Sequence, residues 1–218
     1  MKAICIELAT WYLHYYQKSN AKSEFLNAYN TPGIAPEFAL LVGDLFLKRN
    51  NHMYYLWRFR RNWAYRDELL RRIRSSNLWS TSLVGINTFE DLYRFVWGTL
   101  NNPKIPMISQ LVIYDISVRL VYLQPNNLLM PKDIVYIHAL PMTAFNLLIK
   151  KYNVKGIKRN MPQVPYSQLA RYFPGLDAFQ IEDLLCQLGK SLRRVKNGKS
   201  SVKEADWDID NIIRKYRL

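Results

Sequence analysis

The stretch MYYLWRFRRNWAYRDELLRRIRSS, residues 53–76, repeats its apolar side chains with the period of an α-helix. When successive residues are placed 100° apart, one set of apolar side chains occupies about a third of the helix circumference. That set is Leu56, Phe59, Trp63, Leu70 and Ile73. A stripe of this width is typical of a helix that packs one face against a core. The stretch therefore predicts a long amphipathic helix.

The opposite side of this predicted helix combines arginines with tyrosines. Its members are Tyr54, Arg58, Arg61, Tyr65 and Arg72. A guanidinium group contacts phosphate through two parallel hydrogen bonds, and a tyrosine ring offers a surface on which bases or sugars stack. This face therefore predicts contact with a nucleic acid, either DNA or RNA.

Two other interpretations of this face remain open. Glu68 is spaced to pair with Arg72, and Asp67 with Arg71, which would leave an ordinary solvated helix. Alternatively, the face docks an acidic protein partner. Arg58, by contrast, has no acid within four residues of it in the sequence.

Helical periodicity recurs along most of the chain and predicts an all-α fold, a multi-helix globular bundle. NTFEDLYRFVWGTL is a helix with Thr88 as its N-cap, because a hydroxyl before the first turn accepts a backbone N–H. The segment KDIVYIHALPMTAFNLLIKKY is predicted as two helices, or as one kinked at Pro141. QLVIY and IVYIH are rich in β-formers, but each sits in a helical pattern, so a small sheet is the minor alternative.

The best candidate for a linker is the proline-containing segment 156–165, GIKRNMPQVP. It divides the chain into a main helical domain, residues 1–155, which carries the arginine-rich helix, and a C-terminal basic helical subdomain, residues 166–218. A length of 218 residues accommodates either one large domain or two small ones.

The net charge of +14 favours an anionic partner, although it says nothing about the fold. Two cysteines far apart, Cys5 and Cys186, do not form a disulfide framework or a zinc motif, which favours a reducing cytoplasm. No apolar run approaches the roughly 18 to 20 residues of a membrane span. We therefore expect a cytoplasmic protein without a membrane partner.

A second basic cluster lies near the C-terminus. It consists of Lys190, Arg193, Arg194, Lys196, Lys199 and Lys203. These cations predict a second set of phosphate contacts. They are equally accounted for as charges that complement the C-terminal dipole of a helix.

The segment TPGIAPEFALLV resembles the turn of helix-hairpin-helix proteins, in which a Pro-Gly-apolar-Gly turn precedes a helix. Pro32, Gly33 and Ile34 match that pattern, and Ala35 stands where the second glycine is expected. The segment FPGLDAFQIEDLL matches the same turn less well, and the acids that follow its turn would repel phosphate. The resemblance implies a turn whose N–H groups hold a phosphate.

Residues 105–149 resemble the core of the helix-hairpin-helix DNA glycosylases, in the segments IPMISQLVIYDISVRL and MPKDIVYIHAL. The resemblance implies that Asp133 is a catalytic aspartate, which stabilises positive charge on a sugar as a flipped base departs. No lysine occupies the position of a Schiff-base nucleophile, so such an enzyme would be monofunctional. Asp133 is also explained as a helix cap before Ile134. The same block is similar to uncharacterised bacterial proteins.

No other motif indicates a cofactor or a metal site. The histidines His14, His52 and His138 have no ligand spacing, and we expect His14 and His138 to be core or boundary residues. The acids at positions 206, 208 and 210 are interpreted as helix-capping residues.

The sequence thus predicts a non-catalytic, basic, nucleic-acid-binding protein without cofactor or metal. The alternatives are a glycosylase-like hydrolase that uses Asp133, and a helical adaptor that docks an acidic protein.

Overall fold

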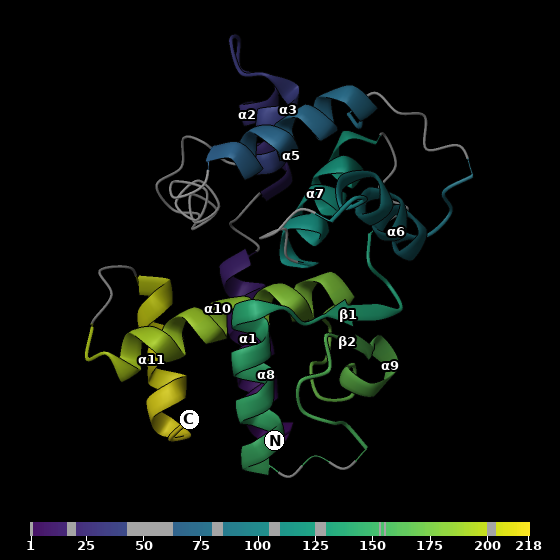
Figure 1. Ribbon diagram of the computed structural model, residues 1–218. Coiled ribbons are helices and arrows are strands. Elements are labelled where there is room, and N and C mark those ends of the chain that lie inside the picture. The colour runs from purple at the N-terminus through teal and green to yellow at the C-terminus, as the bar shows by residue number, and fades with distance from the viewer. Residues whose placement is uncertain are drawn as a thin grey trace. The chain divides into compact units, whose positions relative to one another are not determined.

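The computed structural model describes residues 2–16, 21–42, 63–79, 85–104, 110–124, 130–152, 154, 156–199 and 204–218. Within these residues the chain forms ten helices and two short strands, which confirms the expected all-α class (Figure 1). The chain divides into two compact units. The terminal unit combines Met1–Ser19 with Pro131–Leu218, and the central unit is Asn20–Met130.

The central unit is a small helical bundle. Its described helices are α2 (Ala21–Tyr29), α3 (Pro36–Val42), α5 (Trp63–Ser76), α6 (Phe89–Leu100) and α7 (Gln110–Leu123). Helix α7 packs against α2, α3 and α6 and is buried around most of its circumference. Apolar residues therefore occur on nearly every side of α7, because a helix surrounded by others has no polar face.

The most unusual side chain of the central unit is Arg119 on α7, which is buried. Its Nη1 donates hydrogen bonds to the backbone oxygens of Leu40 at 2.7 Å and Leu41 at 2.9 Å. These oxygens belong to the last turn of α3, where carbonyl groups have no partner within the helix. Arg119 thus satisfies the C-terminal end of α3 from a neighbouring helix.

The N-cap predicted at Thr88 in the central unit is confirmed. The side chain of Thr88 accepts a hydrogen bond from the Asp91 N–H at 3.1 Å and caps α6. In the turn between α2 and α3, the Ile34 N–H donates to the Thr31 oxygen at 3.1 Å, and Gly33 has a φ of +84°. Proline followed by glycine with positive φ is the arrangement of a type II turn.

The terminal unit is organised around its longest helix. Its elements are α1 (Lys2–Tyr16), β1 (Ile134–Tyr136), α8 (Ala139–Tyr152), β2 (Gln163–Pro165), α9 (Tyr166–Leu169), α10 (Ala178–Lys196) and α11 (Glu204–Lys215). Helix α10 packs against α8, α11, α1 and β1. Its buried leucines and isoleucine recur at helical spacing, at Ile181, Leu184, Leu185 and Leu188. This is the stripe expected of a helix with one face in the core.

Gly189 allows α10 to approach the beginning of α8 closely. A Cβ atom at this position would lie 2.9 Å from the carbonyl carbon of Leu140, and closer still to its oxygen. Backbone atoms cannot move aside as the end of a flexible side chain can. Gly189 is therefore required by packing rather than by backbone conformation.

Polar contacts join α1 to α10 and to the end of α11. The Tyr12 hydroxyl donates to Asp183 on α10 at 3.1 Å. Glu7 on α1 forms an ion pair with Lys215 on α11 and accepts a hydrogen bond from the Tyr216 hydroxyl at 3.1 Å. These hydrogen bonds lower the pKa of Glu7 below its ordinary value.

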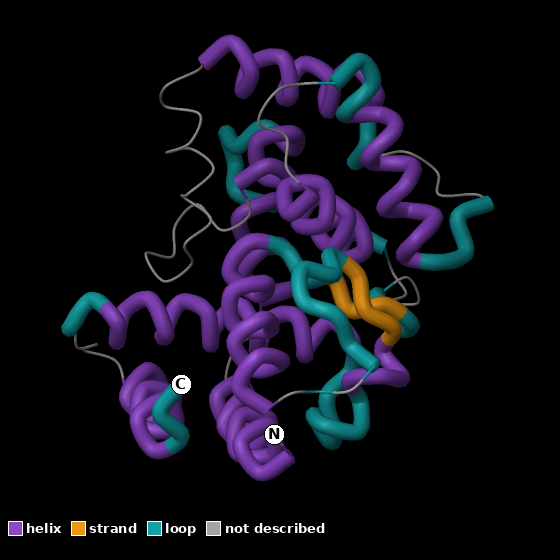
Figure 2. The backbone as a smooth tube through the Cα atoms, turned by 60° about the horizontal axis from the view of Figure 1, so that its bottom comes forward, coloured by secondary structure: helices purple, strands orange, loops and turns teal. Residues whose placement is uncertain are grey.

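The division into units differs from the one expected from the sequence. Part of the expected linker, residues 156–165, is strand β2, which pairs antiparallel with β1 in the same unit (Figure 2). Val135 lies opposite Val164, and both are buried. Proline at the end of a short edge strand is compatible with pairing, since an edge residue needs no N–H on its outer side. Proline content was therefore a poor guide to the boundary.

The helix expected to begin at Ile134 is wrong. Residues 134–136 form β1, and α8 begins only at Ala139. Pro141 then lies in the first turn of α8, where the missing N–H would have no partner, so it produces no kink. The β-branched residues Ile134 and Val135 follow their local preference here.

Candidate nucleic-acid interface

The structure describes only part of the predicted arginine–tyrosine face. Tyr54, Arg58 and Arg61 lie outside the described residues, and for Tyr65 the backbone of α5 is described but the side chain is not. Arg72 is the remaining member of the face, and its environment is well defined.

Arg72 points into the central unit rather than to solvent, with 11% of its side chain exposed. Its Nε donates to Glu68 at 2.8 Å, and its Nη1 donates to the backbone oxygens of Leu100 at 3.0 Å and Pro103 at 2.6 Å. The predicted pair of Glu68 with Arg72 is therefore present. Arg72 joins α5 to the end of α6, which removes it from a surface face.

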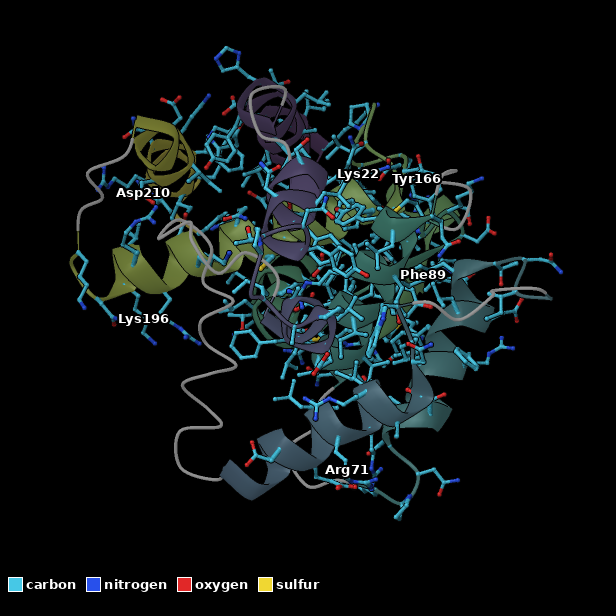
Figure 3. The ribbon with its side chains drawn as sticks, turned by 90° about the horizontal axis from the view of Figure 1, so that it is seen from above. Lys22, Arg71, Phe89, Tyr166, Lys196 and Asp210 are labelled. Carbon is cyan, nitrogen blue, oxygen red and sulfur yellow. The ribbon has the colours of Figure 1, made fainter. Side chains whose placement is uncertain are left out.

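Other described arginines of α5 also have carboxylate partners. Arg71, labelled in Figure 3, pairs with Glu68 at 2.7 Å rather than forming the expected pair with Asp67. Arg74 pairs with the buried Glu37 on α3 at 2.5 Å. Because Glu68 accepts hydrogen bonds from both Arg71 and Arg72, its pKa falls to about 2. The described part of α5 is thus largely neutralised by its own neighbours.

The basic cluster on α10 has a different environment. Arg193, Lys196 and Lys199 are exposed, and none of these has a carboxylate partner among the described residues. Lys190 is half-buried. Lys203 lies outside the described residues.

Arg194 is the exception within this cluster. Its Nη2 lies 2.6 Å from Asp210 Oδ1 on α11 and donates to the Ser191 hydroxyl at 2.9 Å. Asp210 is 2% exposed, so it is a buried partner of Arg194 and not the helix-capping acid that we expected. Figure 3 shows Lys196 on the side of α10 turned away from α11, whereas Asp210 faces α10. Helical phasing agrees, because positions 194 and 196 lie 200° apart.

The end of α10 holds Lys199 in a defined place. The Gly198 N–H donates to the Val195 oxygen at 3.0 Å, and the Lys199 N–H donates to the Arg194 oxygen at 3.1 Å. With a φ of +64° at Gly198, this is a Schellman motif. Arg193, Lys196 and Lys199 therefore project from a fixed backbone; we call these three residues the α10 cationic face.

The terminal unit has a further basic region that the sequence interpretation did not identify. The Nζ of Lys151, at the end of α8, donates to the Arg217 oxygen at 3.0 Å, which brings the ends of α8 and α11 together. The exposed cations near these ends are Lys150, Lys151, Lys158, Arg159, Arg214 and Arg217. One signal was present in the sequence: residues 134–176 contain six Lys or Arg and no Asp or Glu.

Carboxylates occupy the helix starts that resemble helix-hairpin-helix turns. Asp177 accepts the Gln180 N–H at 2.8 Å, and Gln180 in return accepts the Asp177 N–H at 2.9 Å, which closes a capping box at the start of α10. Glu37 lies in the first turn of α3. A phosphate at either helix start would meet a negative charge already in place.

Asp133 is exposed and lies just before β1, so the helix-cap interpretation of this residue is wrong. Its backbone oxygen accepts the Tyr166 N–H at 2.8 Å and extends the β1–β2 pairing. The glycosylase-like segment is also divided, because α7 belongs to the central unit and Asp133 to the terminal unit.

Among the residues that the structure describes, no group of His, Cys, Asp and Glu comes together to hold a metal ion. His138 is buried, as expected, but His14 is exposed, contrary to the expectation for a residue in an apolar helix. Burial raises the pKa of the Cys5 thiol to about 12, so it stays protonated.

None of the helices in the described ranges combines the length and the apolar character that crossing a bilayer requires. No protein-family model, curated protein or solved structure matches the chain.

Proposed function

We propose that the protein binds nucleic acid, DNA or RNA, through phosphate contacts made by the α10 cationic face. The observation that carries the proposal is the contrast within α10: Arg194 has a buried carboxylate partner, whereas Arg193, Lys196 and Lys199 are exposed with none among the described residues. Cations without an internal partner are available for phosphates, and each phosphate contact releases counterions.

The charge of the terminal unit supports this surface as the binding one. The terminal unit carries 18 Lys and Arg against 9 Asp and Glu, and the central unit 13 against 8. A net positive field raises the local concentration of a polyanion and speeds its association. In the central unit, Arg71, Arg72 and Arg74 of α5 are held in ion pairs with Glu68 and Glu37.

The proposal concerns binding and no chemical step. Asp133 is exposed, and the contact that the structure describes for it is the hydrogen bond that its backbone oxygen accepts from the Tyr166 N–H. We therefore assign no reaction to it.

The test is fluorescence anisotropy of the full chain with labelled single-stranded and double-stranded oligonucleotides at several salt concentrations. Removal of the α10 cationic face, in the triple variant with Arg193→Gln, Lys196→Gln and Lys199→Gln, should weaken binding. It should also reduce the slope of log K against log salt by about 2 to 3, since each phosphate contributes about 0.7 to 0.9.

A matched control keeps the change in net charge equal. The triple variant with Lys2→Gln, Lys104→Gln and Lys132→Gln removes three exposed lysines from other elements. If both triple variants bind with the same affinity and the same slope, the α10 cationic face is not the binding surface. If the wild-type chain retains neither DNA nor RNA at low salt, the proposal fails, and an acidic protein becomes the partner to test.

A further inference from the structure

The terminal unit has a surface pocket at the end of α8 that the α10 cationic face does not include. Its volume is ≈ 360 Å³, and its lining residues are Ile149, Lys150, Val154, Ile157 and Arg159. Ligand pockets in proteins typically begin at about 300 Å³, so the space suffices for a small molecule. The lining combines cations with apolar side chains and includes no acid among the described residues.

The floor of this pocket is part of the core. Ile149 and Ile157 are 7% and 6% exposed and belong to the main apolar cluster of the terminal unit. Val154, which is half-buried, packs against the same cluster. Because core side chains are close-packed, the floor is held in shape before any ligand arrives.

The loop that carries Arg159 is tied to α8 by an asparagine pair. The Asn146 Nδ2 donates to Asn160 Oδ1 at 2.7 Å, and the Asn160 N–H donates to Asn146 Oδ1 at 2.8 Å. Asn160 has a φ of +61°, a conformation that asparagine tolerates better than most residues. Arg159, directly before this pair, therefore projects from a backbone with a defined position.

The pocket is electropositive. Lys150 and Arg159 are exposed and have no carboxylate partner among the described residues, and no acid occurs anywhere in residues 134–176. The C-terminus of α8 opposes these charges with the equivalent of only about half an elementary charge. Two full positive charges from Lys150 and Arg159 exceed that value, so an anion is favoured here.

We propose that this pocket binds a nucleoside monophosphate, with its phosphate between Lys150 and Arg159 and its nucleoside on the floor of Ile149, Val154 and Ile157. Arginine binds a phosphate bidentately and lysine adds a point charge. Inorganic phosphate alone would not use the apolar contact that the half-buried Val154 and the small exposed parts of Ile149 and Ile157 offer, whereas the base or sugar of a nucleoside can. If the bound nucleotide is part of a nucleic-acid strand, this proposal rests on the proposed function. If it is a free nucleotide, the two proposals are independent of each other.

The test is isothermal titration of the full chain with adenosine monophosphate, adenosine and inorganic phosphate at the same ionic strength. The monophosphate should bind more tightly than adenosine or phosphate alone. The double variant with Lys150→Gln and Arg159→Gln should weaken it by at least about tenfold, because it removes two charged contacts. A single-charge control is Lys158→Gln, which removes an exposed neighbour outside the lining and should change the affinity by less than about twofold.

The assignment is overturned if the wild-type chain does not bind the monophosphate. It is also overturned if the wild-type chain and a folded double variant bind the monophosphate with equal affinity. If the double variant does not fold, Arg159→Lys replaces it. That variant keeps the charge and loses bidentate geometry, so the affinity should fall by severalfold, and an unchanged affinity again overturns the proposal.

A competition experiment identifies the source of the nucleotide. If single-stranded pentanucleotides displace the monophosphate, the pocket holds one unit of a strand; if they do not, it holds a free nucleotide. The triple variant of the α10 cationic face leaves the lining of the pocket unchanged, so it tests the proposed function separately from the nucleotide proposal. If long oligonucleotides are never retained while the monophosphate still binds, only the proposed function fails.

Discussion

Helices α5 and α10 each carry two adjacent arginines, and the two pairs differ in how many members have a carboxylate partner among the described residues. In α5, Arg71, Arg72 and Arg74 all pair with carboxylates, two of them with Glu68. In α10, Arg194 has such a partner, whereas its neighbour Arg193 has none among the described residues. The number of cations in a stretch of sequence therefore does not measure a binding surface. What matters is how many of them the folded chain leaves without an internal anion.

The largest expected effect concerns the position of α10 itself. In Gly189→Ala, the new methyl group meets the backbone of Leu140, which cannot shift without displacing the start of α8. We expect the free energy of unfolding to fall by about 3 kcal/mol, at the upper end for overpacked cores. Chemical denaturation measures it. A loss below about 0.5 kcal/mol would show that α8 and α10 can move apart to admit the methyl group, and that the position of the α10 cationic face is not fixed.

The second prediction separates the two adjacent arginines of α10. Arg194→Gln leaves the buried Asp210 without its cation, and we expect a loss of about 2 to 3 kcal/mol in unfolding free energy. Arg193→Gln should change stability by less than about 0.5 kcal/mol, because its side chain is exposed. Their effects on oligonucleotide affinity should be reversed in order. If Arg193→Gln destabilises as much as Arg194→Gln, the contrast within α10 is wrong.

The third prediction applies the same comparison to α5. Arg72→Gln removes charged hydrogen bonds to Glu68 and to two backbone oxygens, and we expect a loss of about 1 to 2 kcal/mol. Arg71→Gln should be nearly neutral, since its side chain is 64% exposed. Thermal melts of both variants measure the difference. Equal melting temperatures would contradict the inward position of Arg72.

The fourth prediction concerns pH. The pKa of Glu68 is lowered to about 2 in the folded chain by Arg71 and Arg72. A carboxyl with a lowered pKa stabilises the fold above its ordinary pKa of about 4.3, and that contribution is lost as the pH falls toward 2. Glu68→Gln should therefore remove part of the stability difference between pH 6 and pH 3. Denaturation midpoints at both pH values test this. If the difference in stability between pH 6 and pH 3 is unchanged in the variant, Glu68 does not contribute to the pH dependence of stability.

The smallest expected effect is that of Asp133→Asn. Asp133 is exposed and lies before a strand, and its described contact is the hydrogen bond that its backbone oxygen accepts in the β1–β2 pairing. The substitution should therefore change the free energy of unfolding by less than about 0.5 kcal/mol. Oligonucleotide affinity should also stay within about twofold. Release of a base by the wild-type chain that disappears in this variant would instead restore the catalytic interpretation of Asp133.

Helical period was enough to predict the all-α class, the cap at Thr88 and the pairing of Glu68 with Arg72, because each depends on residues within one turn. The strand at 134–136 was only the minor alternative, because its partner lies almost thirty residues away, at 163–165. The buried role of Asp210 depends on Arg194 of another helix in the same way. Local spacing cannot reveal which distant group a side chain meets.

The candidate site shows the same limit. The exposed state of Lys196 and Lys199 agrees with the sequence interpretation, but Arg72 and Arg194 could be removed from the surface only once their partners were known. The pocket at the end of α8 was not anticipated at all. It depends on an asparagine pair, Asn146 with Asn160, that brings a loop back to a helix.

The attachment of α1 to α10 and α11 has a consequence for synthesis. Helix α1 leaves the ribosome long before its partners Asp183, Lys215 and Tyr216 are made. Until they emerge, the apolar side of α1 has no native surface to cover it, whereas the intervening segment, residues 20–130, can already fold. A nascent chain stalled before residue 178 should thus protect the middle of the molecule from protease and leave its first helix open to a chaperone.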